Sequence, residues 1–133
     1  MDYLETRPDI DVDKLAFYGY SLGAAVGPIF LALEDRIKVS VLHNGGFMPY
    51  EQLPEVDQIN FLPRVKVPTL MLNGKYDFLF PLETAQRPMF QWLGTPDEHK
   101  LILIYDAEHN STPKNERIKE ILNWLDKYLG QVK

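Results

Sequence analysis

Apolar runs of strand length alternate with segments of helical spacing along the chain. Four short runs rich in aliphatic and β-branched residues predict strands. They are residues 14–20 (KLAFYGY), 37–43 (IKVSVLH), 67–73 (VPTLMLN) and 100–105 (KLILIY). Three segments between them predict helices, at residues 22–34, 51–60 and 82–93. Because proline has no N–H to donate, we expect Pro28 to weaken or kink the first of these helices.

The last segment has the strongest helical pattern. Thr112 can cap this helix, Pro113 suits its first position and Gly130 can end it. One face is apolar at helical spacing and consists of Ile118, Ile121, Leu122, Leu125 and Leu129.

Strands that alternate with helices, and that are apolar on both faces, are typical of an α/β fold. We therefore predict a mostly parallel sheet of about four strands, flanked by helices. Right-handed crossovers bring the carboxyl ends of all the strands to one edge of such a sheet. Ligands and reactive groups gather at that edge.

The composition narrows the class of protein. The chain has 133 residues, of which 45% are hydrophobic and 25% charged, which is typical of one globular domain. The net charge of −5 disfavours nucleic acid as a partner. Cysteine is absent, which excludes disulfides and thiolate metal sites. No apolar run approaches the ~20 residues of a membrane helix, and the acidic N-terminus does not resemble a signal peptide. We expect a cytoplasmic protein that does not bind membranes.

Three residues with complementary chemistry follow three of the predicted strands. Ser21 follows the first, Asp77 the third and His109 the fourth. A serine hydroxyl is a poor nucleophile unless a base removes its proton, and a histidine can do so. A carboxylate on the other ring nitrogen fixes the tautomer of that histidine. The order Ser, Asp, His is that of the α/β-hydrolase triad.

The sequence around Ser21, GYSLG, fits a sharp turn from strand to helix. Glycines two residues to either side leave room for such a turn. The helix that follows would direct its free N–H groups, including that of Leu22, at a developing oxyanion. The alternative is an ordinary turn serine with packing glycines.

Other residues compete for these roles. Asp106 and Glu83 are rivals of Asp77 for the acid, and Asp77 could instead be a turn residue. His43 is expected to be structural or to line a pocket, and His99 to lie on the surface. Four aromatic residues are candidates for the substrate pocket, although they could equally be packing residues: Tyr20, Phe47, Tyr76 and Phe78.

Three segments carry a resemblance to a known family. GYSLGAAVG, VPTLMLNGKYD and DAEHN resemble the last three catalytic segments of the α/β-hydrolase superfamily. The serine esterases and dienelactone-hydrolase-like proteins related to prolyl oligopeptidases are most similar. FLPRVKVPTLMLNGKYDFLFP also resembles hydrolase domains fused to some bacterial serine/threonine kinases. The resemblance implies that Ser21 is the nucleophile, Asp77 the acid, His109 the base and the Leu22 amide one oxyanion donor, without a metal or cofactor.

The resemblance covers essentially the whole chain but only part of the family's fold. A complete member has eight strands, and its serine follows the fifth. We therefore expect residues 1–133 to form one partial domain, the C-terminal half of an α/β hydrolase that belongs to a longer polypeptide or stands as a fragment. The loop that supplies the second oxyanion N–H would then lie outside the chain. The first strand would be an open edge, for which we expect a homodimer or larger assembly.

Three functions remain open at this point. The first is a serine hydrolase that acts on a small carboxylic ester or related acyl substrate, with activity reduced by the missing oxyanion donor. The second is a non-catalytic binding or assembly module. The third keeps the triad but makes the protein a peptidase or acyltransferase, since pocket and lid segments decide specificity.

Overall fold

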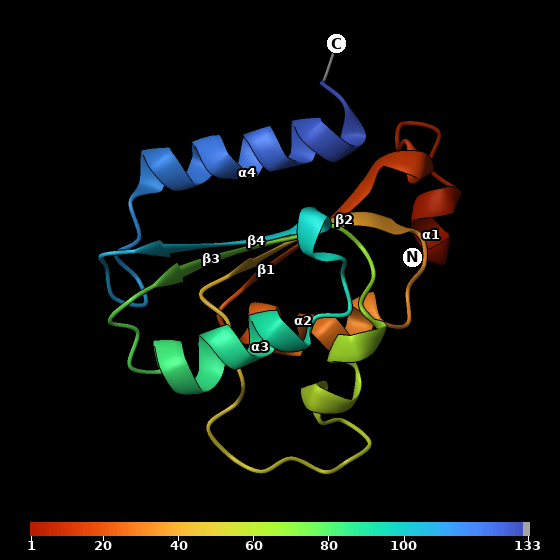
Figure 1. Ribbon diagram of the computed structural model, residues 1–133. Coiled ribbons are helices and arrows are strands. Elements are labelled where there is room, and N and C mark those ends of the chain that lie inside the picture. Colours follow the sequence, from red (N-terminus) through yellow and green to blue (C-terminus); the bar gives the residue numbers. More distant parts are fainter. Residues whose placement is uncertain (132–133) are drawn as a thin grey trace.

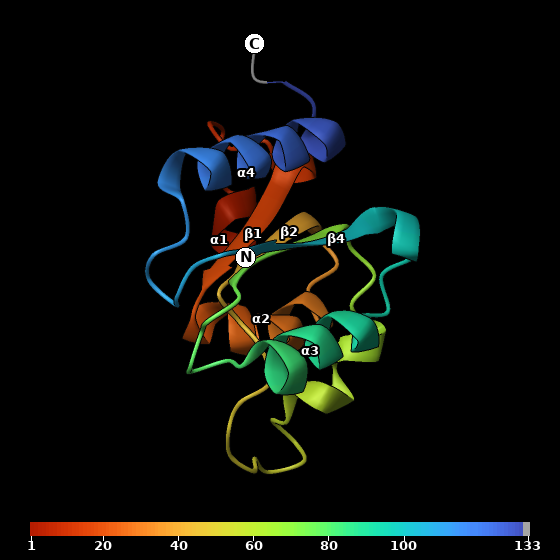
Figure 2. The same ribbon diagram turned by 60° about the vertical axis from the view of Figure 1, so that its left-hand side comes forward.

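The sheet and its helices form three layers. The computed structural model describes residues 1–131. Its four strands are β1 (Leu15–Tyr20), β2 (Ile37–His43), β3 (Thr69–Gly74) and β4 (Lys100–Tyr105). They are parallel and lie in the order β1-β2-β3-β4. Helix α4 covers one face of the sheet, and α2 and α3 cover the other (Figures 1 and 2). The predicted α/β class and parallel sheet are confirmed.

The α-helices are α1 (Asp2–Glu5), α2 (Leu22–Leu31), α3 (Arg87–Trp92) and α4 (Lys114–Leu129). Three of them lie within predicted segments, with shorter bounds, and the short α1 was not predicted. Helix α2 continues through Pro28, whose carbonyl accepts the N–H of Ala32 at 3.0 Å. No helix in residues 1–131 combines the length and the apolar character needed to cross a membrane.

The helix predicted over residues 51–60 is wrong. Only Gln58–Asn60 forms a turn of 3₁₀-helix there. The carboxylate of Asp57 accepts the N–H of Ile59, and the Asn60 amide donates to the carbonyl of Pro54. These side chains bond to nearby main-chain groups and so compete with a continuous helix.

The segment predicted as a single helix over residues 82–93 is divided. Leu82–Gln86 forms a π-helical turn, in which the N–H of Gln86 donates to the carbonyl of Pro81. Helix α3 begins after it and contains Pro88 in its first turn. Because Pro88 cannot donate to a carbonyl of the preceding turn, the regular α ladder is interrupted at this point.

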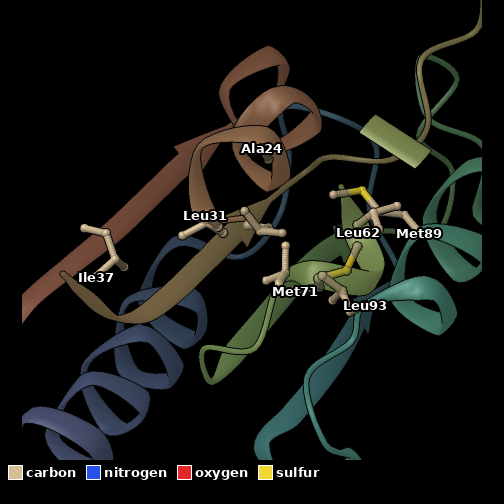
Figure 3. Close-up of a cluster of buried hydrophobic side chains, with 9 residues drawn as sticks. Ala24, Leu31, Ile37, Leu62, Met71, Met89 and Leu93 are labelled. Carbon is tan, nitrogen blue, oxygen red and sulfur yellow. The ribbon is translucent and has the colours of Figure 1, made fainter. Parts of the chain in front are cut away.

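Each face of the sheet has its own hydrophobic core. Nine buried residues form the core under α2 and α3, and Figure 3 shows this cluster. Under α4, Trp124 packs on Val39, Val41, Leu70 and Leu72. These two cores hold β2 and β3 in the middle of the molecule, with all six residues of β3 buried.

The predicted apolar face of α4 is partly wrong. Ile121, Leu125 and Leu129 pack against the core with Trp124, as their spacing indicates. Ile118 and Leu122 instead are 41% and 55% exposed. The bulky Trp124 turns the buried side of α4 away from these two residues.

The predicted C-terminal end of α4 is correct, and the predicted N-terminal cap is wrong. Gly130, with φ 78°, ends the helix as expected, since glycine accepts positive φ without strain. Pro113 occupies the capping position, and no side chain caps the helix. Thr112 is therefore not the cap, because its hydroxyl is hydrogen-bonded to His43 and Arg117.

Candidate active site

Ser21 occupies the sharp turn between β1 and α2. Its backbone has φ 54° and ψ −114°, a conformation that costs a non-glycine residue about 1–3 kcal/mol. The Ser21 N–H donates to the carbonyl of His43 at 2.9 Å, and its own carbonyl accepts the N–H groups of Ala24 and Ala25. These bonds hold the turn, so the serine side chain leaves the sheet at its carboxyl edge.

His109 lies in the loop between β4 and α4 and contacts both Ser21 and Asp77. Its Nε2 is 2.8 Å from Ser21 Oγ, and its Nδ1 is 2.6 Å from Asp77 Oδ2. The imidazole is buried, and the carboxylate of Asp77 is fully shielded from solvent. The three candidates taken from distant parts of the sequence thus form one continuous hydrogen-bonded chain.

Asp77 is held by the turn that follows β3. Its Oδ1 accepts the N–H groups of Leu79 and Phe80 at 2.9 and 3.0 Å, which leaves Oδ2 for His109. The ring of Phe80 packs beside His109 at a centroid distance of 5.9 Å. One oxygen therefore fixes the carboxylate, and the other orients the imidazole.

The rival residues lie elsewhere. Asp106 is solvent-exposed and makes no hydrogen bond to His109 in the described chain. Glu83 pairs with Arg87 at 3.0 Å on the surface. His99 is exposed and lies 3.1 Å from the hydroxyl of Tyr128. The geometry favours Asp77 and His109 over all three.

His43 is buried directly beside the triad. Its Nδ1 lies 2.8 Å from the hydroxyl of Tyr18, and its Nε2 lies 3.0 Å from that of Thr112. Burial, with smaller contributions from the charges of Arg117 and His109, lowers the pKa of His43 to about 4. The imidazole is therefore neutral at physiological pH and acts as a hydrogen-bonding link between strand and loop.

Tyr20 lies against both histidines of this region. Its ring centroid is 4.8 Å from that of His43 and 5.8 Å from that of His109, and its hydroxyl donates to Asn110. A hollow of about 410 Å³ is lined by Tyr18, Tyr20, His43, Asn110 and Arg117. Arg117 makes no salt bridge within residues 1–131, so this hollow carries positive charge.

Of the other candidate pocket residues, Phe47 lines a hollow, whereas Tyr76 and Phe78 are exposed beside Asp77. Phe47 lines a second hollow, of about 540 Å³, together with Met48, Pro49, Tyr50, Glu51, Pro81, Thr84 and Ala85. Tyr76 and Phe78 flank Asp77 in the sequence but are 56% and 77% exposed. Their place beside Asp77 makes them available to a bound molecule without burying them in the protein.

Sequence reasoning missed a group of buried amides around the triad. Asn44 donates from Nδ2 to the carbonyl of His109, and Asn73 donates to that of Gly45 at 2.8 Å. Gln86 donates to the carbonyls of Gly74 and Phe80. A signal was present for the two asparagines, because each stands at the carboxyl end of an apolar strand, where a polar residue is costly to bury without a role.

The main-chain N–H of Leu22 lies at the first position of α2. The first N–H groups of a helix have no partner within the helix, and they favour negative charge. Leu22 can therefore donate to an oxyanion formed next to Ser21. The described residues hold no group of three His, Asp or Glu side chains arranged for a metal ion.

Comparison with known proteins gives the fold family. No family model matches the sequence. A zinc-bound structure of a cold-adapted esterase from an Arctic intertidal metagenomic library is similar with a TM-score of 0.80 and 26% identity, over 96% of this chain and 54% of that one. The 2,6-dihydroxy-pseudo-oxynicotine hydrolase gives 0.78 and 21%, over 96% and 44%. The acylaminoacyl peptidase of Pyrococcus horikoshii gives 0.75 and 17%, over 99% and 27%.

These similarities extend over nearly all of this chain, which spans about half the length of the esterase. The parallel sheet, the serine at the turn after β1 and the order Ser, Asp, His occur here together with the shared fold. The chain therefore has the fold of the α/β-hydrolase superfamily.

Proposed function

We propose that this protein is a serine hydrolase that acts on a carboxylic ester or a related acyl compound. The observation that carries the proposal is the continuous hydrogen-bonded chain from Ser21 Oγ through His109 to Asp77. Such a chain matches the roles of nucleophile, base and orienting acid.

The reaction follows from this geometry. Ser21 Oγ attacks the acyl carbon while His109 Nε2 takes the hydroxyl proton. The same proton then goes to the leaving alcohol as the ester C–O bond breaks, which leaves an acyl-serine. Water attacks the acyl-serine with His109 again as base, which releases the acid and restores the serine hydroxyl. Asp77 stabilises the imidazolium in both steps.

The turn at Ser21 also places a main-chain N–H that can stabilise the negative charge of the tetrahedral intermediate. The tetrahedral intermediate carries an oxyanion, and the N–H of Leu22 at the start of α2 is placed to donate to it. One donor of this kind contributes about 10²–10³ in rate. A second donor belongs to a complete oxyanion hole, so we expect the isolated chain to turn over slowly.

Similar proteins support the choice of ester chemistry. The esterase from the Arctic library shares 26% identity with this chain, and it is named for its action on esters. The hollows beside Tyr20 and Phe47 are the spaces into which an acyl or alcohol group could extend.

The test is covalent labelling combined with turnover. A fluorophosphonate probe should modify Ser21, and the wild type should hydrolyse p-nitrophenyl acetate. Ser21→Ala should abolish both, and His109→Ala should lower both by about 10³-fold or more. Ser111→Ala is the matched control, because this serine is exposed and its hydroxyl accepts only the N–H of Glu108. Equal labelling of the wild type and Ser21→Ala would refute the nucleophile.

The same measurement separates the alternatives. A correctly folded wild type that neither reacts with the probe nor hydrolyses esters would favour a binding or assembly module. Labelling of Ser21 with amide cleavage faster than ester cleavage would instead indicate a peptidase.

A further inference from the structure

The residues at the carboxyl end of β2 contact both Ser21 and His109. The carbonyl of His43 accepts the Ser21 N–H at 2.9 Å, and the next residue, Asn44, donates from its side chain to the carbonyl of His109. Two consecutive residues therefore hold the serine and the histidine against one strand end. Neither the carbonyl of His43 nor the side-chain amide of Asn44 takes part in a bond-making or proton-transfer step of the proposed reaction.

Asn44 is buried and hydrogen-bonded to the sheet, so it can hold the main chain of His109 in place. Its side chain is fully buried, and its N–H donates to the carbonyl of Leu72 in β3 at 2.8 Å. Its φ of 51° lies in the left-handed region, which asparagine tolerates better than most residues. The backbone thus turns at Asn44 so that its amide reaches the loop of His109.

Two further contacts join the same parts of the molecule. The ring of His43 lies 3.0 Å from the hydroxyl of Thr112, three residues after His109. The hydroxyl of Tyr20, the residue before Ser21, donates to Asn110, the residue after His109. The loop of His109 is therefore tied to the strand ends on both sides of the imidazole, and Asn44 bonds to His109 itself.

We propose that Asn44 is a positioning residue of the hydrolase site, which sets the main chain of His109 so that Nε2 meets Ser21 Oγ. The proposal rests on the proposed function and adds a residue to it. A displacement of about 1 Å in a reacting group can cost about 10²-fold in rate, even when the group itself is intact. Loss of the Asn44 amide should therefore lower kcat without a matching change in KM.

Two variants remove the bond in different ways. Asn44→Gly keeps the left-handed backbone and deletes the side chain. Asn44→Asp keeps the size of the side chain and replaces its N–H donors with a carboxyl group. We expect each to lower kcat for p-nitrophenyl acetate at least ~10-fold, with KM changed less than ~3-fold, because ground-state binding does not require the His109 geometry.

The matched control is Thr95→Val, because this threonine contacts the segment just before β3 begins, away from the carboxyl ends of the strands. Thr95 is also buried, and its hydroxyl donates to the carbonyls of Val65 and Val67, which ties two loops as Asn44 does. Removing this donor leaves the carbonyl of Val65 without its side-chain partner, while Val67 keeps that of Thr69, and should lower the free energy of unfolding by about 1–3 kcal/mol, with kcat within ~2-fold of the wild type. Comparison at equal loss of stability separates positioning from general destabilisation.

A spectroscopic measurement decides the case independently of turnover. The proton between His109 Nδ1 and Asp77 Oδ2, in a contact of 2.6 Å, should give a downfield NMR signal in the folded protein. We expect this signal to broaden or disappear in both Asn44 variants and to persist in Thr95→Val. If the wild type proves inactive, the proposed function fails, and this signal alone decides whether Asn44 positions His109.

The proposal would be overturned if folded Asn44→Gly and Asn44→Asp kept the downfield signal of the wild type. It would equally be overturned if their kcat values matched that of Thr95→Val.

Discussion

At the scale of single residues, the two oxygens of Asp77 have different partners. Oδ1 accepts two main-chain N–H groups, and Oδ2 faces His109 Nδ1. A carboxylate can only accept hydrogen bonds, so the proton of a neutral His109 must reside on Nδ1, and Nε2 is free to take the proton of Ser21.

Asp77→Asn tests this arrangement with almost no change in shape. The amide oxygen can keep the two N–H groups of Leu79 and Phe80, which places its NH₂ against His109 Nδ1. The histidine must then carry its proton on Nε2, where it cannot act as a base. We expect kcat/KM for p-nitrophenyl acetate to fall by about 10³–10⁴ with little change in melting temperature. Unchanged kinetics would mean that Asp77 is not the orienting acid.

His43 makes stability depend on pH. Its pKa in the folded protein is about 4, below the value of about 6.5 in an unfolded chain. Below pH 6.5 the unfolded state therefore takes up a proton more readily than the folded state. The contribution of the neutral His43 to stability is complete above that pH and is lost as the pH falls towards 4.

We therefore expect the free energy of unfolding to fall by about 2 kcal/mol between about pH 7.5 and pH 4.5 through His43, given about 1.4 kcal/mol per pKa unit. Tyr18, Tyr20, Thr112, Arg117 and His109 are the groups that surround it. Urea titrations at several pH values should show that the free energy of unfolding depends less steeply on pH in His43→Gln than in the wild type. His99→Gln, at an exposed histidine, should retain the slope of the wild type, and a flat wild-type curve would contradict the assignment.

At the scale of elements, the two glycines that flank Ser21 have unequal roles. A Cβ added to Gly19 would lie 2.5 Å from the carbonyl oxygen of Gly23 and 2.8 Å from the N atom of Ala24. A Cβ added to Gly23 would meet nothing within 4 Å. The close approach of β1 and α2 thus requires glycine on the strand side only. The expectation that both glycines leave room for the turn is correct for Gly19 and wrong for Gly23.

Gly19→Ala and Gly23→Ala form a matched pair. Gly19→Ala forces backbone atoms apart, and we expect it to destabilise the protein by about 2 kcal/mol or more. Gly23→Ala improves helix propensity by up to about 1 kcal/mol and should be neutral or stabilising. Thermal unfolding of both variants checks the prediction, and a stable Gly19→Ala would show that the turn relaxes more easily than the contact implies.

The elements also show how far sequence patterns reach. The four strands were predicted within one or two residues, because each is a largely apolar run between polar turns, although only β2 and β3 are buried on both faces. The π-helical turn before α3 was not predicted, since it depends on Pro88, which cannot donate to a carbonyl, and on the distant N–H of Phe47, which donates to the carbonyl of Ala85. Trp124 was omitted from the apolar face of α4 because only packing fixes the rotation of a helix.

The residues of the candidate site were also predicted only in part. Ser21, Asp77 and His109 could be proposed from the sequence because their chemistry is unusual at strand ends. Asn44 carried a weaker signal, a polar residue at a strand end, and its role could not be predicted because it depends on contact with a residue 65 positions away. Reactive groups are recognised by type, whereas the groups that position them are recognised by their contacts.

At the scale of the whole molecule, β1 is an edge strand. Within residues 1–131 it pairs only with β2, and its residues Tyr18 and Tyr20 are 52% and 41% exposed. Leu22, Val26 and Phe30 are exposed along α2 beside it, and Phe30 packs on Phe17 of β1 at a ring-centroid distance of 5.6 Å. Unpaired backbone groups next to exposed apolar side chains favour association with another chain.

We propose that a second copy of this chain pairs with the β1 edge, and a charge placed on that edge tests the idea. Ala16→Lys adds a charge at an exposed position of β1, and Leu101→Lys adds one to β4 at the opposite edge of the sheet. Sedimentation of the isolated chain should show self-association that Ala16→Lys weakens by about tenfold or more, since two buried lysines in a symmetric contact cost at least ~1.4 kcal/mol together. Leu101→Lys should associate as the wild type does. A wild type that stays monomeric at high concentration, or equal weakening by both variants, would show that β1 is not the contact.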